Sequence, residues 1–153
     1  DGELRDAAFE LLGKLGAPAV PGLSRLLNDK NDKIRWEVVE TMLFAGRLAA
    51  VPAVLEGLSP ARTYSKEDLR DFVVRDIGKL GPAALPPLRD ALKSGSWVAR
   101  ICAAMAIAEL GKAADAPAVA ALSGDGFKLK GWPGGATIGS EATALAATLR
   151  ARH

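Results

Sequence analysis

Four arginines and four glycines divide this chain into four rows of similar length. Each arginine is followed eleven residues later by a glycine, and successive rows begin 30, 35 and 30 residues apart. A repeat period this short is typical of a solenoid, and it argues against a globular enzyme. The four pairs are Arg5 and Gly16, Arg35 and Gly46, Arg70 and Gly81, and Arg100 and Gly111.

Within each row the apolar residues have the spacing of a helix. In the first row Leu4, Ala8, Leu11, Leu12 and Leu15 follow this spacing. A polar residue before each helix is a candidate N-cap, and the glycine after it is expected to adopt the left-handed conformation that ends a helix. The candidate caps are Asp1, Asn31 or Asp32, Ser65 and Ser96.

A second helix is predicted to follow each glycine. A proline stands five or six residues after every one of these glycines, in the first turn of the helix, where the amide has no intrahelical partner. The chain is therefore predicted to be all-α, with about four helix pairs. The expected helices are 2–15 and 18–28, 32–45 and 48–58, 66–80 and 83–93, and 97–110 and 113–122.

Three stretches carry a family resemblance. They are LLGKLGAPAVPGLSRLLNDKNDKIR (11–35), DIGKLGPAALPPLRDAL (76–92) and AIAELGKAADAPAVAAL (106–122). Over about residues 3–123 the pattern resembles the HEAT-repeat family, and more closely its short bacterial branch, the PBS-lyase-type HEAT-like repeats. The resemblance implies a right-handed α-solenoid with armadillo-like helical architecture. It also implies a non-enzymatic protein-interaction or scaffold module.

The same family implies a role for the arginine column. Its members commonly join an Asp at the end of one second helix to the Arg of the next first helix, and Asp29 and Arg35 match that spacing. Tyr64 and Ser94 stand at the equivalent position in the next two rows, so the carboxylate link is expected to be broken or substituted there. We interpret the four arginines as structural; the alternative is that they bind an extended acidic partner.

Two segments interrupt the repeat. The 35-residue step places about five extra residues between Ser59 and Asp68. Residues 124–139 hold six glycines and cannot be helical over their length, whereas Ser140 is expected to cap a final helix. We predict one domain, with a repeat region at 1–123 and a Gly-rich loop plus capping helix at 124–153.

The capping role follows from the first helix of the fourth row. Residues 97–110 are apolar nearly all round, so this helix must be covered on more than one side. The final helix offers a stripe formed by Ala142, Leu145, Ala146 and Leu149, which suits packing on a surface of small side chains. We expect it to fold back onto the fourth pair.

The sequence holds no recognisable arrangement of catalytic residues. The only histidine is His153, so histidine-based catalysis and a histidine-containing zinc site are poorly supported. The single cysteine, Cys102, lies among small apolar residues and is interpreted as a packed residue. We expect no catalytic residue, metal or cofactor, with a lyase-associated subunit as the residual alternative.

The charge balance disfavours nucleic acid as a partner. The chain has 20 basic and 18 acidic residues, and the second helices show no stripe of one sign. Their surface positions include Arg25, Glu56 and Arg89, which are candidates for contact with a protein or peptide. The longest apolar run, Ile101–Ala108, is too short to span a bilayer, so we expect a cytoplasmic protein with no membrane contact.

Two large side chains in the second row are further candidates. Trp36 and Phe44 stand where the first and third rows have charged residues, and they are predicted to face outward. An outward apolar cluster indicates either a partner or a covering group. We prefer a covering group, namely the extended turn that carries Pro60 and Tyr64.

The Gly-rich segment supports a rival hypothesis. Lys128, Lys130 and Trp132 combine positive charge with an aromatic ring, as in proteins that bind nucleic acid. Trp132 is expected either to be pinned against the repeats or to be free for a partner. A third hypothesis, an accessory or subunit role in attaching phycobilin chromophores, depends on the family resemblance alone.

Overall fold

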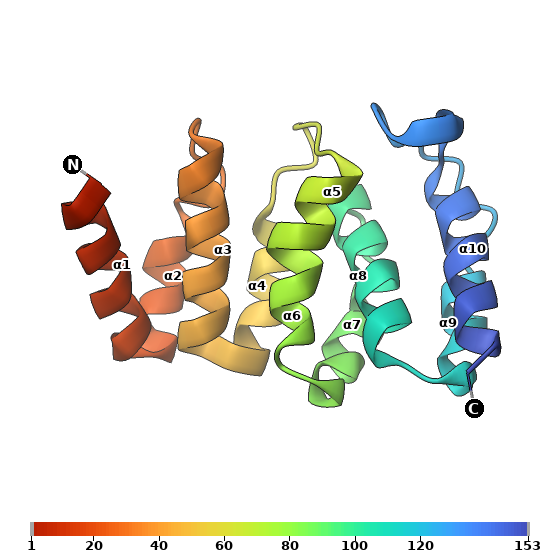
Figure 1. Cartoon of the computed structure of the whole chain (residues 1–153), viewed down its shortest axis with the longest axis horizontal. Coiled ribbons are helices and arrows are strands. Elements are labelled where there is room, and N and C mark those ends of the chain that lie inside the picture. The colour runs from red at the N-terminus through yellow and green to blue at the C-terminus, as the bar shows by residue number, and fades with distance from the viewer. Residues whose placement is uncertain (1, 153) are drawn as a thin grey trace.

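The computed structural model describes residues 2–152, and every regular element in this range is helical. Each row forms two helices that run in opposite directions and are joined by a short turn (Figure 1). Asp1 and His153 lie outside the described residues, so the candidate cap and the sole histidine are not located.

The first helices of the four rows form one layer. They are α1 (Gly2–Leu15), α3 (Asp32–Gly46), a continuous helix made of α5 (Lys66–Leu69), the π-helical turn η3 (Arg70–Val74) and α6 (Arg75–Gly78), and α8 (Trp97–Leu110). Successive members of this layer pack against one another, and the pairs lie side by side along the long axis (Figure 1).

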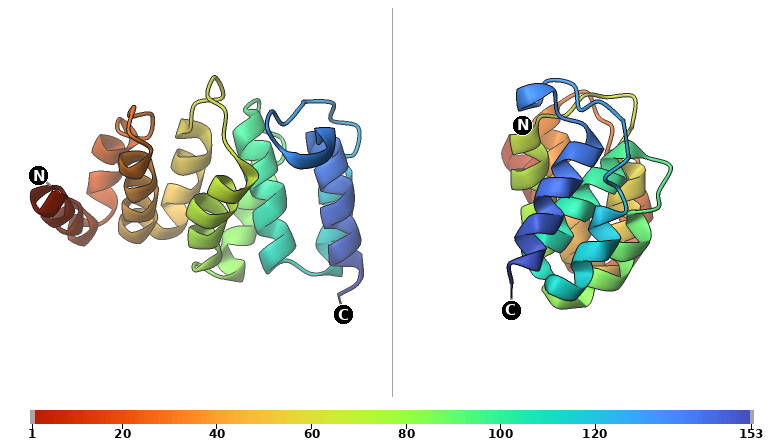
Figure 2. Two further views of the ribbon diagram at one scale, coloured as in Figure 1. Left: turned by 45° about the horizontal axis from the view of Figure 1, so that its top comes forward. Right: turned by 90° about the vertical axis from the view of Figure 1, so that its right-hand side faces the viewer.

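The second helices form the other layer (Figure 2). Each begins with a 3-10 turn. All but the second-row helix are shorter than predicted; the regular helix predicted at 18–28, for example, ends at Ser24. They are η1 (Ala17–Ala19) with α2 (Val20–Ser24), η2 (Arg47–Ala49) with α4 (Ala50–Gly57), η4 (Pro82–Ala84) with α7 (Leu85–Ala91), and η5 (Ala113–Asp115) with α9 (Ala116–Ala120).

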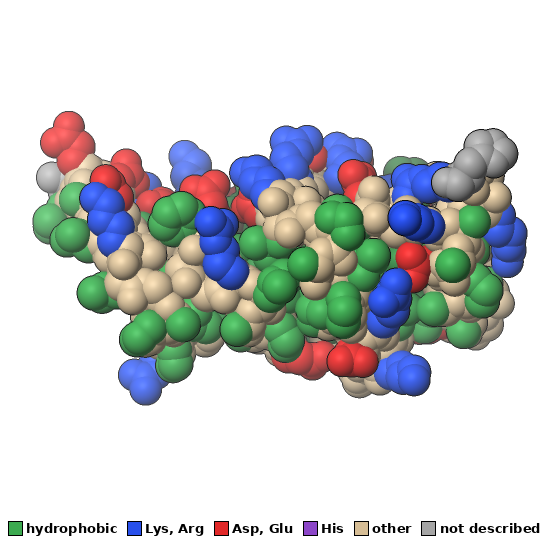
Figure 3. Space-filling model, turned by 90° about the horizontal axis from the view of Figure 1, so that it is seen from below, with side chains coloured by type: hydrophobic (Ala, Val, Ile, Leu, Met, Phe, Trp, Pro, Cys, Tyr) green, Lys and Arg blue, Asp and Glu red, His purple; other side chains and the backbone are tan. Residues whose placement is uncertain are grey.

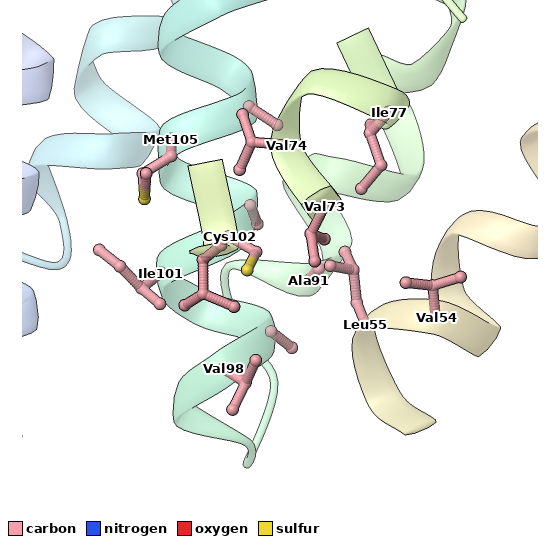
Figure 4. Close-up of a cluster of buried hydrophobic side chains, with 14 of the residues drawn as sticks. Val54, Leu55, Val73, Val74, Ile77, Ala91, Val98, Ile101, Cys102 and Met105 are labelled. Carbon is pink, nitrogen blue, oxygen red and sulfur yellow. The ribbon is translucent and has the colours of Figure 1, made fainter. Parts of the chain in front are cut away.

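The core follows the repeat. Leu23, Val54, Leu88 and Val119 each stand two residues after the proline of their row, and all are at most 1% exposed. Figure 4 shows the centre of this core, where Cys102 of α8 points into the cluster. Burial raises the pKa of the Cys102 thiol to about 12, so the expectation of a packed, unreactive cysteine is confirmed.

The glycine that ends the first helix of each row is required for one of two different physical reasons. Gly16 and Gly81 have φ of 76° and confirm the predicted left-handed helix end. The prediction is wrong for the other two, since φ is −100° at Gly46 and −86° at Gly111. Close packing explains them: a Cβ on Gly46 would lie 2.8 Å from Val20 Cγ2, and one on Gly111 would lie 2.7 Å from the Ile107 carbonyl oxygen.

The predicted caps are partly confirmed. The side chains of Asn31 and Ser65 accept hydrogen bonds from Lys33 N and Asp68 N, whereas Ser96 makes no such bond. The last helix, α10 (Ile138–Arg150), begins two residues before Ser140. Thr137 is its N-cap, and Thr137 and Ser140 bond reciprocally, so the predicted cap at Ser140 is corrected.

The C-terminal segment packs on the repeats. Between α9 and α10 lies a loop containing the 3-10 turn η6 (Pro133–Gly135), with Leu129 and Trp132 buried. α10 packs against α8 and α9 (Figure 1), and its residues Ala142, Ala146 and Leu149 are fully buried. α8 is buried over most of its length, as its apolar sequence requires.

One helical stretch, Asp32–Gly57, is long and apolar enough to cross a membrane by length and composition alone. It consists of α3, η2 and α4, and the backbone changes direction at Arg47, whose φ is 52°. α3 and α4 pack against each other (Figure 1), and half of the apolar window is buried inside the fold. The helix pair of the second row therefore accounts for its apolar character.

Candidate binding groove

Two of the column arginines bind main-chain carbonyl groups. Arg35 donates to the carbonyl oxygen of Asp29 at 2.7 Å, and Arg100 donates to that of Ser94 at 3.0 Å. The expected Asp29 carboxylate link is absent, because that carboxylate accepts the amide of Asn31 instead. The main-chain acceptor explains why Ser94 can replace an Asp, since a carbonyl group does not depend on the side chain.

Three of the column arginines pair with carboxylates, since Arg100 Nε also lies 2.8 Å from Asp125 Oδ2. Arg5 Nε lies 3.6 Å from Glu37 Oε2, and Arg70 Nε lies 3.0 Å from Asp71 Oδ1. Both arginine side chains are more than a third exposed. The column therefore does not form one continuous ladder along the rows.

Trp36 is buried, so the prediction that it offers a surface to a partner is corrected. Its ring stacks on Phe72 at 5.3 Å between centroids and lies 6.1 Å from Tyr64. Tyr64 belongs to the extended turn that was expected to cover it. Phe72, from the third row, was not foreseen.

These rings belong to a longer aromatic chain on the side where the rows connect. Tyr64 lies 5.9 Å from Trp97, and Trp97 stacks on Phe127 at 5.1 Å. The indole nitrogen of Trp97 also donates to the carbonyl oxygen of Pro60 at 2.8 Å. These aromatic contacts therefore hold the extended turn and the start of the Gly-rich segment against the repeats.

The remaining predicted residues fall into two groups. Trp132 is 5% exposed and is pinned against the body of the protein, so it does not present its ring to a partner. Arg89 is bonded to the carboxylate of Asp115 at 2.7 Å. The other candidates, which are exposed but not gathered into one site, are Arg25, Glu56, Lys128 and Lys130.

Phe44 is the one predicted partner-binding residue that lies in a sizeable hollow. Its ring is 59% exposed and lies over Gly13 of α1, where an added Cβ would come within 3.0 Å of Phe44 Cδ1. A glycine inside a helix is unfavourable, so Gly13 opposite a large ring is a sequence signal that the repeat comparison missed. Glycine here makes room for the Phe44 ring.

The hollow around this ring crosses three helices of the first layer, and we call it the Phe44 groove. Its volume is about 630 Å³. Its apolar part comes from Phe9, Leu43, Phe44 and Leu80. The other lining residues are Asp6, Glu10, Gly13, Lys14, Glu37, Glu40, Thr41, Arg47, Asp76 and Lys79.

Five carboxylates and three cations surround this apolar part. The pKa of Glu37 is raised, first by partial burial and then by the neighbouring Asp6 carboxylate, although Arg5 acts in the opposite direction. Asp6 and Glu10 belong to α1, Glu37 and Glu40 to α3, and Asp76 to α6. They meet at one groove because α1, α3 and α6 bring distant parts of the chain together.

A second hollow, of about 550 Å³, lies on the outer side of α1 and α2. Leu4 at this end is 71% exposed, whereas its equivalents Leu69 and Ala99 in later rows are fully buried. In those rows the preceding helix pair covers the equivalent surface. This hollow is lined by Leu12, Leu15, Pro18, Ala19, Gly22, Leu23 and Leu26.

The turns within the pairs form a separate apolar face. Figure 3 shows hydrophobic side chains spread along this face, with most of the charged side chains near its edges. Exposed Ala and Pro residues of the turns contribute to it, together with Leu48, which is 38% exposed. This face is broad and shallow compared with the Phe44 groove.

A family model matches part of the repeat region. The family model for HEAT repeats matches residues 55–128, from α4 into the Gly-rich segment, which supports a HEAT-repeat family for this chain. No curated protein and no solved structure shows a significant match.

Proposed function

We propose that this HEAT-repeat chain is a right-handed α-solenoid that acts as a non-enzymatic protein-interaction or scaffold module. HEAT repeats are generally modules of this kind. The family match and the side-by-side helix pairs of Figure 1 support the proposal. The short period of 30 residues also favours the PBS-lyase-type branch of the family.

The exposed ring of Phe44 is the observation that carries the proposal. Aromatic side chains contribute strongly to protein interfaces when a partner covers them. Phe44 is the most exposed aromatic residue in the described part of the chain, and it lies in a groove with both apolar and charged lining. A segment of a partner protein is therefore the proposed occupant.

Nucleic acid is a weaker candidate. Lys128 and Lys130 are exposed, but the ring of Trp132 is buried and is not offered to a base. The net charge is only +2. We expect a duplex oligonucleotide to bind weakly at near-physiological salt, and submicromolar affinity would contradict this expectation.

Selection of peptides displayed on phage against the immobilised protein tests the proposal. The enriched peptides are then titrated against the wild type and Phe44→Ala by fluorescence anisotropy. Truncating a central aromatic contact costs about 1–2 kcal/mol or more, so we expect binding to weaken roughly tenfold.

Leu11→Ala is the matched control, because Leu11 is apolar and 64% exposed but does not line the groove. It is expected to leave binding unchanged. Peptides that bind Phe44→Ala as tightly as the wild type would show that the groove is not the site. Failure to enrich any peptide would count against the interaction function itself.

A further inference from the structure

The charges on α1 and α6 at the Phe44 groove are already partly matched. Lys14 Nζ lies 3.2 Å from Glu10 Oε1, and Lys79 Nζ lies 3.0 Å from Asp76 Oδ1. Arg47 lies over the Phe44 ring, with its guanidinium carbon 5.6 Å from the centroid. These three cations therefore leave the middle of the groove acidic.

The acidic middle is formed by Glu37 and Glu40 of α3, with Asp6 of α1 beside them. Glu37 and Asp6 share one guanidinium, since Arg5 Nε lies 3.6 Å from the first and 4.0 Å from the second. Glu40 takes part in none of the ion pairs found among the described residues. Within residues 2–152, Arg5 is therefore the one ion-pair partner of these three carboxylates, and Lys79, already paired with Asp76, is the further cation that the charge of Glu40 affects.

Partial burial makes the shortage of nearby cations unfavourable for the ionised form of Glu37. The pKa of this carboxyl is raised even though Arg5 is close, because burial and the Asp6 charge outweigh the attraction. A further cation beside Glu37 would favour its ionised form. An apolar segment without a cation would instead remove water from these carboxylates without supplying an ion pair or a hydrogen bond in its place.

The carboxylates and the ring lie along one stripe of α3. Glu37, Glu40 and Phe44 are spaced by three and four residues, which places them on one helix face. At about 1.5 Å per residue, the stripe is roughly 10 Å long from Glu37 to Phe44 and roughly 6 Å long from Glu40. In an extended chain, at about 3.3 Å per residue, these lengths correspond to two or three residues.

We infer that the Phe44 groove binds an extended peptide segment in which a Lys or Arg stands two or three residues from a large apolar residue. The cation lies beside Glu37 and Glu40, and the apolar side chain lies on the exposed part of the Phe44 ring. This inference rests on the proposed function, and it specifies the chemistry of the partner.

Four short synthetic peptides with one Gly/Ser host sequence test the inference. The first carries Arg and Leu at the inferred spacing, and the others replace Arg by Glu, Arg by Gln, or Leu by Ser. Each is titrated by fluorescence anisotropy against the wild type, Phe44→Ala and the double variant Glu37→Gln/Glu40→Gln. A second double variant, Glu67→Gln/Glu109→Gln, removes the same charge from exposed positions outside the groove.

The Arg–Leu peptide is expected to bind most tightly and to lose affinity roughly fivefold to tenfold in Glu37→Gln/Glu40→Gln. The control double variant should bind it like the wild type, and added salt should weaken it. If the Glu–Leu or Gln–Leu peptide binds as tightly and remains sensitive to Phe44→Ala, the charge inference is wrong but the groove remains the site. If no peptide binds, or if Phe44→Ala has no effect, the groove and the inference both fail.

Discussion

The indole nitrogen of Trp132 donates a 3.0 Å hydrogen bond to the main-chain carbonyl oxygen of Tyr64, 68 residues earlier in the chain. Tyr64 belongs to the extended turn and Trp132 to the Gly-rich segment, the two parts that interrupt the repeat. Both side chains are almost fully buried. The two irregular segments are therefore joined to each other as well as to the helices.

Trp132→Phe is expected to lower the free energy of unfolding by about 1–2 kcal/mol. It removes the donor, leaves the Tyr64 carbonyl group without this partner, and fills less volume. Urea denaturation followed by circular dichroism measures the change. Lys130→Ala, in the same loop but exposed, should alter stability by less than about 0.5 kcal/mol; equal effects would refute the structural role of Trp132.

Gly139→Ala is expected to destabilise the protein by about 1–3 kcal/mol. The start of α10 passes so close to the loop before it that an added Cβ would lie 2.8 Å from the carbonyl oxygen of Asp125 and even nearer that of Ser123. Differential scanning calorimetry should show a lower Tm. Gly124→Ala is the control, since nothing lies within 4 Å of its Cβ position; an unchanged Tm for Gly139→Ala would contradict the packing.

Asp115 is expected to make stability depend on acid pH. Burial alone would raise the pKa of Asp115, but hydrogen bonds from the Lys112 amide and the Arg89 guanidinium hold it below its ordinary value of 3.8. A lowered folded-state pKa stabilises the fold above the ordinary value, and that stabilisation is lost as pH falls through the folded-state pKa.

The free energy of unfolding, measured from neutral pH down to about pH 2, checks this dependence. Asp115→Asn should remove part of the fall below about pH 4, worth about 1 kcal/mol because half-exposed Arg89 is screened by solvent. Asp90→Asn, at an exposed position of α7, is the control. A fall of the same size in Asp115→Asn and wild type would rule out the assignment.

Ala146→Asp is expected to detach α10 from the repeats. Ala146 is fully buried, so an unpaired carboxylate there must either be desolvated or pull the helix away from α8 and α9. We expect a lower Tm and association detected by light scattering, as for deletion of residues 124–153. Ala147→Asp, one residue along on the exposed face, should remain monodisperse; identical behaviour of the two variants would argue against a capping role.

The repeat made much of the layer of first helices predictable. The bounds of α8 were predicted correctly because its apolar pattern runs between a polar residue and a glycine. The aromatic chain could not be predicted this way, because its contacts join residues that have no aromatic counterpart in other rows. Trp36, for example, contacts the rings of Phe72 and Tyr64, and no other row has a pair of aromatic residues at the same sequence separations.

The groove was predictable only in part. The row comparison marked Phe44 as unusual, but it did not indicate that Gly13 would lie beneath the ring. It also gave no sign that Glu37 lies beside Asp6, because these residues meet only when α1 packs on α3. Helical periodicity gives the face on which a residue lies, whereas a groove depends on which faces of different helices become neighbours.

The position of α10 also limits where a further helix pair could be added to this array. Tandem duplication lengthens such proteins by inserting whole helix pairs, and each new pair needs an uncovered neighbour on which to pack. Because α10 already occupies the surface of α8 and α9, a pair copied after α9 would compete with it for that place. A pair copied between existing rows would meet repeat surfaces on both sides and would leave the contacts of α10 with α8 and α9 in place.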